Sequence, residues 1–134
     1  MRGPFLLIAA FAGGCSVGAQ SPDWAWARQT VSGDQPLNNF LSTAMDGEGN
    51  TLVTGYFGGT MDLLGTVFTT GSINDVDVVV AKFAPDGALL WARQGGTTST
   101  GEWDMGKRVA CDDSGNVYVA VSYTHLTLPT SDLV

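Results

Sequence analysis

Cysteine, histidine and basic residues are scarce in this sequence, and each scarcity narrows the possible functions. Two cysteines in 134 residues cannot form a disulfide framework, which needs several pairs. One histidine and the absence of a Cys-x-x-Cys pair argue against a zinc site. Six basic residues against thirteen acidic ones give a formal net charge of −7, which argues against a nucleic-acid backbone or an anionic membrane surface as partner.

Long hydrophobic segments and catalytic motifs are also missing. The apolar run Phe5–Ala12 is too short to span a bilayer, so we expect no membrane span. There is no Gly-x-Ser-x-Gly motif, and the only histidine, His125, lies in an atypical last segment. We therefore expect no catalytic residue, no metal and no cofactor. Glycine is plentiful, with 18 residues, and the length fits one globular domain at most.

The N-terminus has the pattern of a secretory signal in residues 1–19. Arg2 supplies a positive start, Phe5–Ala12 an apolar centre, and small residues follow. Cleavage after Ala19 is one interpretation. The other is a lipoprotein signal that ends at residue 14 and leaves Cys15 as a lipidated N-terminus. Both predict an extracytoplasmic protein, either secreted or held at the outer membrane or cell surface.

The stretch Asp77–Gln94 predicts a β-hairpin. Apolar residues occupy both sides of its first half, which is typical of a strand covered on both faces. Pro85-Asp86-Gly87 then supplies turn residues: proline pre-sets φ, aspartate bonds backbone, and glycine accepts a positive φ. Leu89 to Arg93 returns as the second strand.

Two motifs recur in the same order with nearly the same offset. Trp26-Ala27-Arg28-Gln29 returns as Trp91-Ala92-Arg93-Gln94 after 65 residues. The turn Asp46-Gly47-Glu48-Gly49-Asn50 returns as Asp112-Asp113-Ser114-Gly115-Asn116 after 66 residues, and each copy precedes a strand-like run. This is the signature of a repeat protein.

One period holds four candidate strands and no helical periodicity. We predict strands at Phe40–Met45, Thr51–Phe57, Asp77–Phe83 and Ala88–Gln94. The expected fold class is therefore all-β, with the antiparallel four-stranded blades of a β-propeller, one complete and one partial, over residues 24–120. The repeats would span about 24–90 and 91–120. The long connection between the second and third strands predicts a minor hairpin, Met61–Leu64 with Val67–Thr70, around Gly65.

The segments DGEGNTLVTGYF, DVVVAKFAPDGALLWARQ and CDDSGNVYVA resemble the bacterial SBBP-type β-propeller repeat family. Its repeats run approximately VDxxGNVYVTGxF…DxFVAKxxxxGxxxWARQ, and the likeness covers Trp24 to Ala120. The resemblance implies a propeller domain of an extracytoplasmic bacterial protein, generally without an assigned reaction. Cys111 replaces a small apolar residue of the pattern, and Asp62–Phe68 matches it loosely.

Two acidic groups suggest ligand sites, each against a plainer interpretation. Oxygen ligands at Asp62, Asn74, Asp75 and Asp77 could bind calcium, yet no known calcium-loop spacing is present, so solvated turn aspartates are favoured. An acid pair beside an aromatic at Glu102-Trp103-Asp104 could act on carbohydrate. The equivalent loop of the first repeat lacks such a group, so Trp103 is expected to pack between blades.

Three further segments carry expectations. Trp24–Gln29 matches the last strand of a blade, and we expect it to complete a blade with strands far downstream that this sequence does not include. Cys111 is expected to behave as a small buried residue. Residues 121–134 break the repeat: VSYTHLTLPT resembles a translated sequencing-library adapter, so this tail is expected to be non-native and His125 functionless.

These patterns favour an extracytoplasmic propeller repeat protein with a non-enzymatic binding or cell-envelope scaffold role. Its ligand would be a protein or a glycan, and the full-length propeller would be monomeric. The alternative is a fragment of a propeller enzyme, a glycan or peptide hydrolase or lyase, whose catalytic residues lie in other blades. Acidic or histidine residues recurring at channel-facing positions would favour the enzyme.

Overall fold

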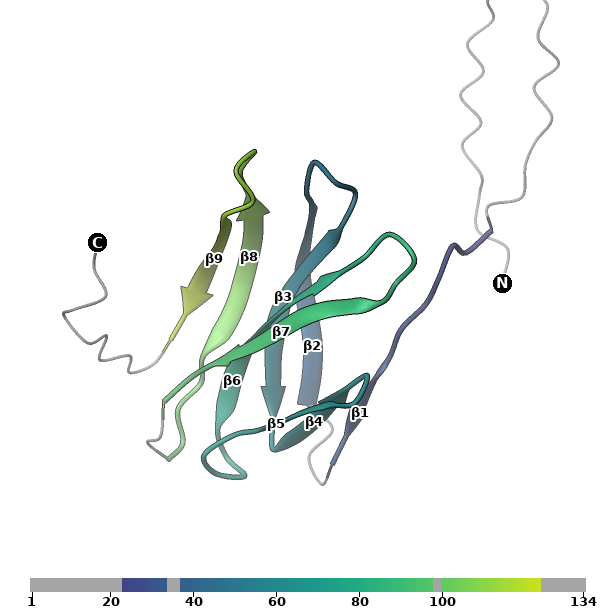
Figure 1. Cartoon of the computed structure of the whole chain (residues 1–134). Coiled ribbons are helices and arrows are strands. Elements are labelled where there is room, and N and C mark those ends of the chain that lie inside the picture. The colour runs from purple at the N-terminus through teal and green to yellow at the C-terminus, as the bar shows by residue number, and fades with distance from the viewer. Residues whose placement is uncertain (1–22, 34–36, 98–99, 124–134) are drawn as a thin grey trace, which may run out of the picture.

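The computed structural model describes residues 23–33, 37–97 and 100–123, in which all regular structure is β-strand (Figure 1). The strands are β1 (Thr30–Ser32), β2 (Leu37–Met45), β3 (Thr51–Gly58), β4 (Thr60–Leu63), β5 (Thr66–Thr69), β6 (Val76–Phe83), β7 (Leu89–Gly95), β8 (Met105–Cys111) and β9 (Val117–Ser122). They form a four-stranded, a three-stranded and a two-stranded sheet. No helix in these residues is long and apolar enough to cross a membrane.

The four-stranded sheet has the order β2-β3-β6-β7, with antiparallel pairing throughout. These are the four strands that the first repeat predicts, so the all-β prediction is confirmed. Strand β2 begins three residues earlier than expected, and a bulge interrupts its pairing between Phe40 and Ser42. Tight turns join β2 to β3 and β6 to β7, and the β4–β5 hairpin is inserted between β3 and β6. Strands that follow one another in this sheet therefore pair as neighbours.

One face of this sheet holds the hydrophobic core. The β4–β5 hairpin covers it, and β1 pairs with β4. The sequence predicts this hairpin around Gly65, one residue away from its observed strand bounds, but not its place on the core. Asp62 shapes the hairpin turn, because its Oδ1 accepts the Gly65 N–H at 2.7 Å. The buried residues of this core are Phe57, Met61, Leu63, Val79, Ala81, Phe83 and Ala92, with Trp26, Val53, Phe68 and Leu89 packed against them.

The opposite face packs against the two-stranded sheet. Strand β8 lies against β2 and β3, with β9 further out (Figure 1). Gly106 comes so close to β3 that a Cβ there would overlap the Thr54 side chain. The Val109 N–H donates to Ser42 Oγ at 3.2 Å, which ties β8 to the bulge of β2. The second repeat therefore begins by stacking its first two strands on the first repeat.

Two boundaries differ from the sequence-based expectation. Trp24–Gln29 is not a strand, and the described residues hold no strand that pairs with it. The strands with which we expect it to pair lie further downstream, so that expectation stays a prediction. Strand β9 also continues through Val121 and Ser122, with Val121 opposite Gly106, two residues beyond the predicted end of the repeat.

Candidate binding interface

The N-terminal segment holds the turn of the β6–β7 hairpin. Trp26 Nε1 donates to the Pro85 carbonyl at 3.1 Å, and Arg28 Nε donates to the Gly87 carbonyl at 2.8 Å. The Trp26 ring also stacks on Phe83, with ring centroids 5.7 Å apart and planes at 30°. We call Trp26 and Arg28 the turn clamp. Two donors spaced two residues apart thus meet two carbonyls spaced two residues apart.

Gly87 fits this clamp for two reasons. Its φ is +82°, a left-handed backbone that other residues adopt only with strain. In addition, a Cβ at Gly87 would lie 2.7 Å from the Trp26 ring. The Asp86 side chain completes the turn, because its Oδ1 accepts the Ala88 N–H at 2.9 Å. The tryptophan therefore packs directly on the turn backbone.

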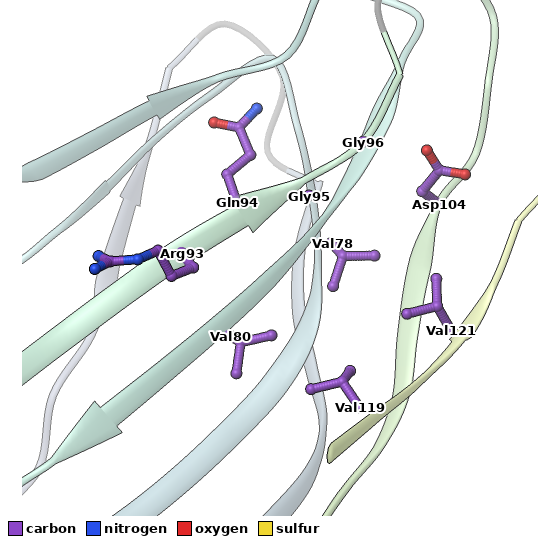
Figure 2. Close-up of a pocket in the computed structure, with 9 residues that line it drawn as sticks. All are labelled: Val78, Val80, Arg93, Gln94, Gly95, Gly96, Asp104, Val119 and Val121. Atoms are coloured by element: carbon purple, nitrogen blue, oxygen red, sulfur yellow. The ribbon is translucent and has the colours of Figure 1, made fainter. Parts of the chain in front are cut away.

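The second copy of the clamp motif lies on β7, at the edge of an open cavity. This cavity of about 340 Å³ separates β6 and β7 from β9 (Figure 2). Strand alternation puts Trp91 on the same face of β7 as Arg93, which lines the cavity. The lining residues are Val78, Val80, Arg93, Gln94, Gly95, Gly96, Asp104, Val119 and Val121. A pocket of this size with apolar walls and few polar groups is the usual form of a binding site.

Arg93 has the same local conformation as the clamp arginine. Arg93 Nη1 donates to the Ala92 carbonyl at 2.9 Å, and Arg28 Nη1 donates to the Ala27 carbonyl at 3.2 Å. Arg28 makes its further bond to the turn through Nε. Within the described residues, Arg93 Nε donates no hydrogen bond. Trp91 and Arg93 thus repeat the residue types and spacing of the turn clamp, and no turn meets them among the described residues.

Three buried aspartates lie where β6 begins and where the chain passes to β8. Asp75, Asp77 and Asp104 are 2%, 4% and 1% exposed. Asp77 accepts a hydrogen bond from Gln94 Nε2, and Asp75 Oδ1 accepts one from the Gly101 N–H. Among the described residues, neither oxygen of Asp104 receives a well-aligned hydrogen bond. A buried carboxyl group without such bonds, as at Asp104, favours the neutral form.

The pKa values follow this arrangement. Burial raises the pKa of Asp77, with Asp104 and Asp75 adding to the rise and the Gln94 hydrogen bond opposing it. Burial also raises the pKa of Asp104, opposed by the Thr97 backbone N–H and increased by Glu102 and Asp75. Asp104 lies at one end of the cavity lining, beyond the four valines (Figure 2). Asp77 and Asp104, where the chain passes from one sheet to the other, are therefore easier to protonate than exposed aspartates.

The residues of the calcium hypothesis do not come together. Asp62 shapes the β4–β5 turn, and Asn74 lies exposed in the loop before β6. In the part of the chain that the structure describes, no three His, Cys, Asp or Glu side chains are placed to hold a metal ion. Asp75 and Asp77 lie together at the start of β6, whereas Asp62 and Asn74 belong to other turns and loops.

The carbohydrate hypothesis at Glu102-Trp103-Asp104 meets a similar obstacle. This segment pairs with the start of β6: the Val76 N–H donates to the Glu102 carbonyl at 2.9 Å, and the Asp104 N–H donates to the Val76 carbonyl at 2.7 Å. Asp104 is buried, so its carboxyl cannot meet a bulky sugar from solvent. Trp103 is 47% exposed, so the prediction that it packs between blades is wrong.

The two aspartate turns have the same geometry. Asp46 Oδ1 accepts the Glu48 and Asn50 N–H groups at 3.0 and 2.9 Å. Asp112 Oδ1 accepts the Ser114 and Asn116 N–H groups at 3.0 and 2.9 Å. The predicted hairpin turns are therefore confirmed in both repeats. The repeat in the sequence is also a repeat in the structure.

The partners of the two turn aspartates differ. Asp46 forms an ion pair with Lys82 of β6 at 2.7 Å, which together with Asn50 lowers the pKa of Asp46. Asp112 accepts hydrogen bonds from Asn116 and from the Tyr118 hydroxyl, which lower the pKa of Asp112. The first turn is thus anchored by the third strand of its sheet, a strand that β8 and β9 lack among the described residues.

Other residues singled out from the sequence have simpler outcomes. Cys15, the candidate lipidation site, and His125 lie outside the described residues. Cys111 ends β8, is partly buried rather than fully buried, and lies with its Sγ 3.4 Å from the Met45 carbonyl. The pairing of Trp26 and Arg28 with the hairpin turn was not foreseen. The recurrence of Trp-Ala-Arg-Gln was its signal in the sequence.

Comparisons with known proteins give no further identification: no protein-family model, no curated protein and no solved structure matches this chain. The resemblance to SBBP-type repeats therefore stays a prediction from the quoted motifs.

Proposed function

We propose that this chain is a repeat module of an exported β-propeller-type protein, and that it works in binding or as a scaffold rather than in catalysis. The observation that carries the proposal is the stacking of two sheets that come from two successive copies of the same sequence repeat. The four-stranded sheet is a meander, and β8–β9 repeat its first two strands against its face. Radial stacking of such meanders builds a propeller.

Binding suits the interface better than catalysis does. The cavity wall consists of valines from β6 and β9, with Arg93, Gln94 and Asp104 as its charged and amide side chains. Nucleophilic catalysis needs a nucleophile and a base within hydrogen-bond reach, and this lining offers no such pair. An apolar wall favours a protein segment over a glycan, because sugar hydroxyls need many hydrogen-bond partners. The preferred ligand is therefore a protein.

The architecture can be tested by joining copies of residues 30–95 in tandem. A propeller predicts that a monomer of about four to eight copies closes, melts cooperatively, and stops growing in maximum dimension by small-angle X-ray scattering. A linear stack predicts that the maximum dimension increases by the same step with each added copy. Continued linear growth would reject the propeller.

Export can be tested separately in a Gram-negative host. We expect mass spectrometry of envelope fractions to show loss of residues 1–14 or 1–19, because Arg2 and Phe5–Ala12 form a signal pattern. Fatty-acid labelling that disappears in Cys15→Ala would assign lipidation. An unlabelled product starting at Gln20 would assign ordinary cleavage, and an intact N-terminus would contradict export.

A further inference from the structure

We propose that the side chains of Asp75, Thr97 and Asp104 bind a calcium ion, at the place where β6 begins and the chain passes to β8. Two carboxylates and one hydroxyl supply the protein ligands, and water completes the coordination. This site goes beyond the binding or scaffold role. It depends neither on the cavity beside Arg93 nor on any further repeat, because its three residues belong to the described part of the chain.

The backbone brings the two aspartates together. The Val76 N–H donates to the Glu102 carbonyl at 2.9 Å, and the Asp104 N–H donates to the Val76 carbonyl at 2.7 Å. Asp75 directly precedes Val76, so this short parallel pairing puts the two aspartates on adjacent segments. The Gly101 N–H also donates to Asp75 Oδ1, which ties the segment before β8 to the start of β6.

Four buried oxygen atoms at this place have no hydrogen-bond partner among the described residues. They are Asp75 Oδ2, both carboxylate oxygens of Asp104, and Thr97 Oγ1. The two aspartates are only 2% and 1% exposed, so bulk water does not solvate them. Buried polar groups in proteins are nearly always paired, and an unpaired buried carboxylate is costly. These oxygens therefore indicate a bound group that pairs with them.

The charges around these oxygens favour a cation as that group. Burial raises the pKa of Asp104, and the negative charges of Glu102 and Asp75 raise it further, against the hydrogen bond of the Thr97 backbone N–H. Burial also raises the pKa of the neighbouring Asp77, on which Asp104 and Asp75 act in the same way. The charges that act on both carboxyl groups are thus negative. A divalent cation between Asp75 and Asp104 removes this repulsion, and a neutral ligand does not.

Asp77 lies beside the calcium site and is not one of its ligands. Its Oδ2 accepts a hydrogen bond from Gln94 Nε2, and a Cβ at Gly96 would overlap its carboxylate. Asp77 is therefore already enclosed by protein atoms. Two carboxylates remain for the ion, which agrees with the absence, in residues 23–33, 37–97 and 100–123, of three acidic, His or Cys side chains placed around one metal ion.

Calcium suits this site better than magnesium does. All the unpaired atoms are oxygens, which are the ligands of both ions. Magnesium requires near-ideal octahedral geometry and keeps several of its waters, whereas calcium accepts irregular sets of protein oxygens. The near-complete burial of Asp75 and Asp104 leaves little space for such waters. Because only two carboxylates contribute charge, we expect a weak dissociation constant of about 10⁻⁴–10⁻³ M.

The test uses the full chain, freed of metal with a chelator and titrated with calcium chloride at neutral pH and constant ionic strength. Calcium should raise the melting temperature of the wild type in a saturable way, because it binds the folded state. Without calcium, Asp104→Asn should melt higher than the wild type, since it removes a buried charge. With saturating calcium the order should reverse, since the variant has lost a ligand. Asp75→Asn should also lose the calcium-induced shift. Asp113→Asn is the matched control at an exposed position and should keep it.

Terbium luminescence gives a second measurement that does not depend on stability. Tb³⁺ replaces calcium at oxygen sites and emits when a nearby tryptophan is excited, and Trp103 directly precedes Asp104. We expect the wild type to sensitise Tb³⁺ and calcium to displace it. Trp103→Phe should reduce the luminescence but retain the calcium-induced rise in melting temperature. Circular dichroism of each variant checks that its fold is retained.

Four results would overturn the inference. The first is no saturable calcium effect on the wild-type chain. The second is a calcium-induced shift in Asp104→Asn as large as that of the wild type. The third is an equal shift with magnesium, which would mean general screening of negative charge. The fourth is stabilisation by mild acid with none by calcium, which would mean that protons alone neutralise Asp75 and Asp104.

Discussion

The two repeats of this chain are built from the same motifs but are completed to different extents. The first has four strands, and its last hairpin is held by Trp26 and Arg28. The second has two strands in the described residues, and its clamp, Trp91 and Arg93, faces an open cavity. The first copy of the Trp-Ala-Arg-Gln motif thus holds the hairpin turn at the end of its own repeat, whereas the second copy meets no turn among the described residues.

The two copies of the Trp-Ala-Arg-Gln motif also differ in backbone conformation. Trp91–Gln94 is part of strand β7, whereas Trp26–Gln29 is irregular. Their arginines nevertheless make the same bond to the preceding carbonyl. Strand formation thus depends on a neighbouring strand, while the clamp depends on an extended backbone that puts residues i and i+2 on one side.

The largest expected contrast lies in the apolar core. Phe57→Ala should lower the free energy of unfolding by about 3–5 kcal/mol, because it empties a fully buried position. Tyr118→Ala, in the second repeat, should change it by less than about 1 kcal/mol, because Tyr118 is 58% exposed. Urea unfolding followed by tryptophan fluorescence measures both. Equal losses would mean that the second repeat packs as tightly as the first.

A smaller contrast is expected between two turn glycines. Gly87→Ala should cost about 2–3 kcal/mol, from the positive φ and from displacement of Trp26. Gly115 has a φ of +83°, but a Cβ there would meet open space. Gly115→Ala should therefore cost only the backbone strain, about 1 kcal/mol. The same urea experiment compares them. If Gly115→Ala costs as much, the contact with Trp26 adds nothing.

Much of the fold is predictable from the sequence, because local signals and tertiary contacts agree. The four strands of the first sheet and the hairpin around Gly65 are confirmed, since turn residues separate runs of β-formers. The irregular Trp24–Gln29 is not predictable from its motif, because pairing depends on a distant neighbour. The exposure of Trp103 is missed for a similar reason: its segment is fixed by backbone bonds to Val76.

The candidate site is predictable only in its parts. The recurrence of Trp-Ala-Arg-Gln marks the residues, but the contact of Trp26 and Arg28 with Pro85 and Gly87 spans 59 residues. No local pattern encodes such a distance. The buried aspartates look like ordinary turn residues in the sequence, and their burial follows from how the segment after β7 folds back on β6.

The two clamp arginines should differ modestly in their contribution to stability. Arg28→Ala should lower the free energy of unfolding by about 1 kcal/mol, because it removes a charge-assisted hydrogen bond that is partly open to solvent. Arg93→Ala should leave it within about 0.5 kcal/mol, since Arg93 bonds only its own neighbour among the described residues. Thermal unfolding of both variants tests this. A loss in Arg93→Ala equal to that in Arg28→Ala would show that Arg93 already has a structural partner.

The smallest expected effect is a pH dependence that separates the two kinds of aspartate. The pKa values of Asp77 and Asp104 are raised above the ordinary 3.8, so their neutral forms stabilise the fold. That contribution is fully present below pH 3.8 and is lost as pH rises through the raised values. The pKa values of Asp46 and Asp112 are lowered, so their contribution is present above pH 3.8 and is lost as pH falls through the lowered values.

Stability should therefore increase from neutral pH to mildly acidic pH and decrease again in strong acid. Asp104→Asn should raise the melting temperature at pH 7 and flatten the increase toward acidic pH, because an amide carries no charge to bury. Asp113→Asn, an exposed position in the second turn, is the matched control and should leave the profile unchanged. Melting temperatures across the pH range measure both variants. An unchanged profile in Asp104→Asn would mean that the Asp104 carboxylate is already well solvated or paired, and the buried joint between the two sheets would then have no part in the pH response.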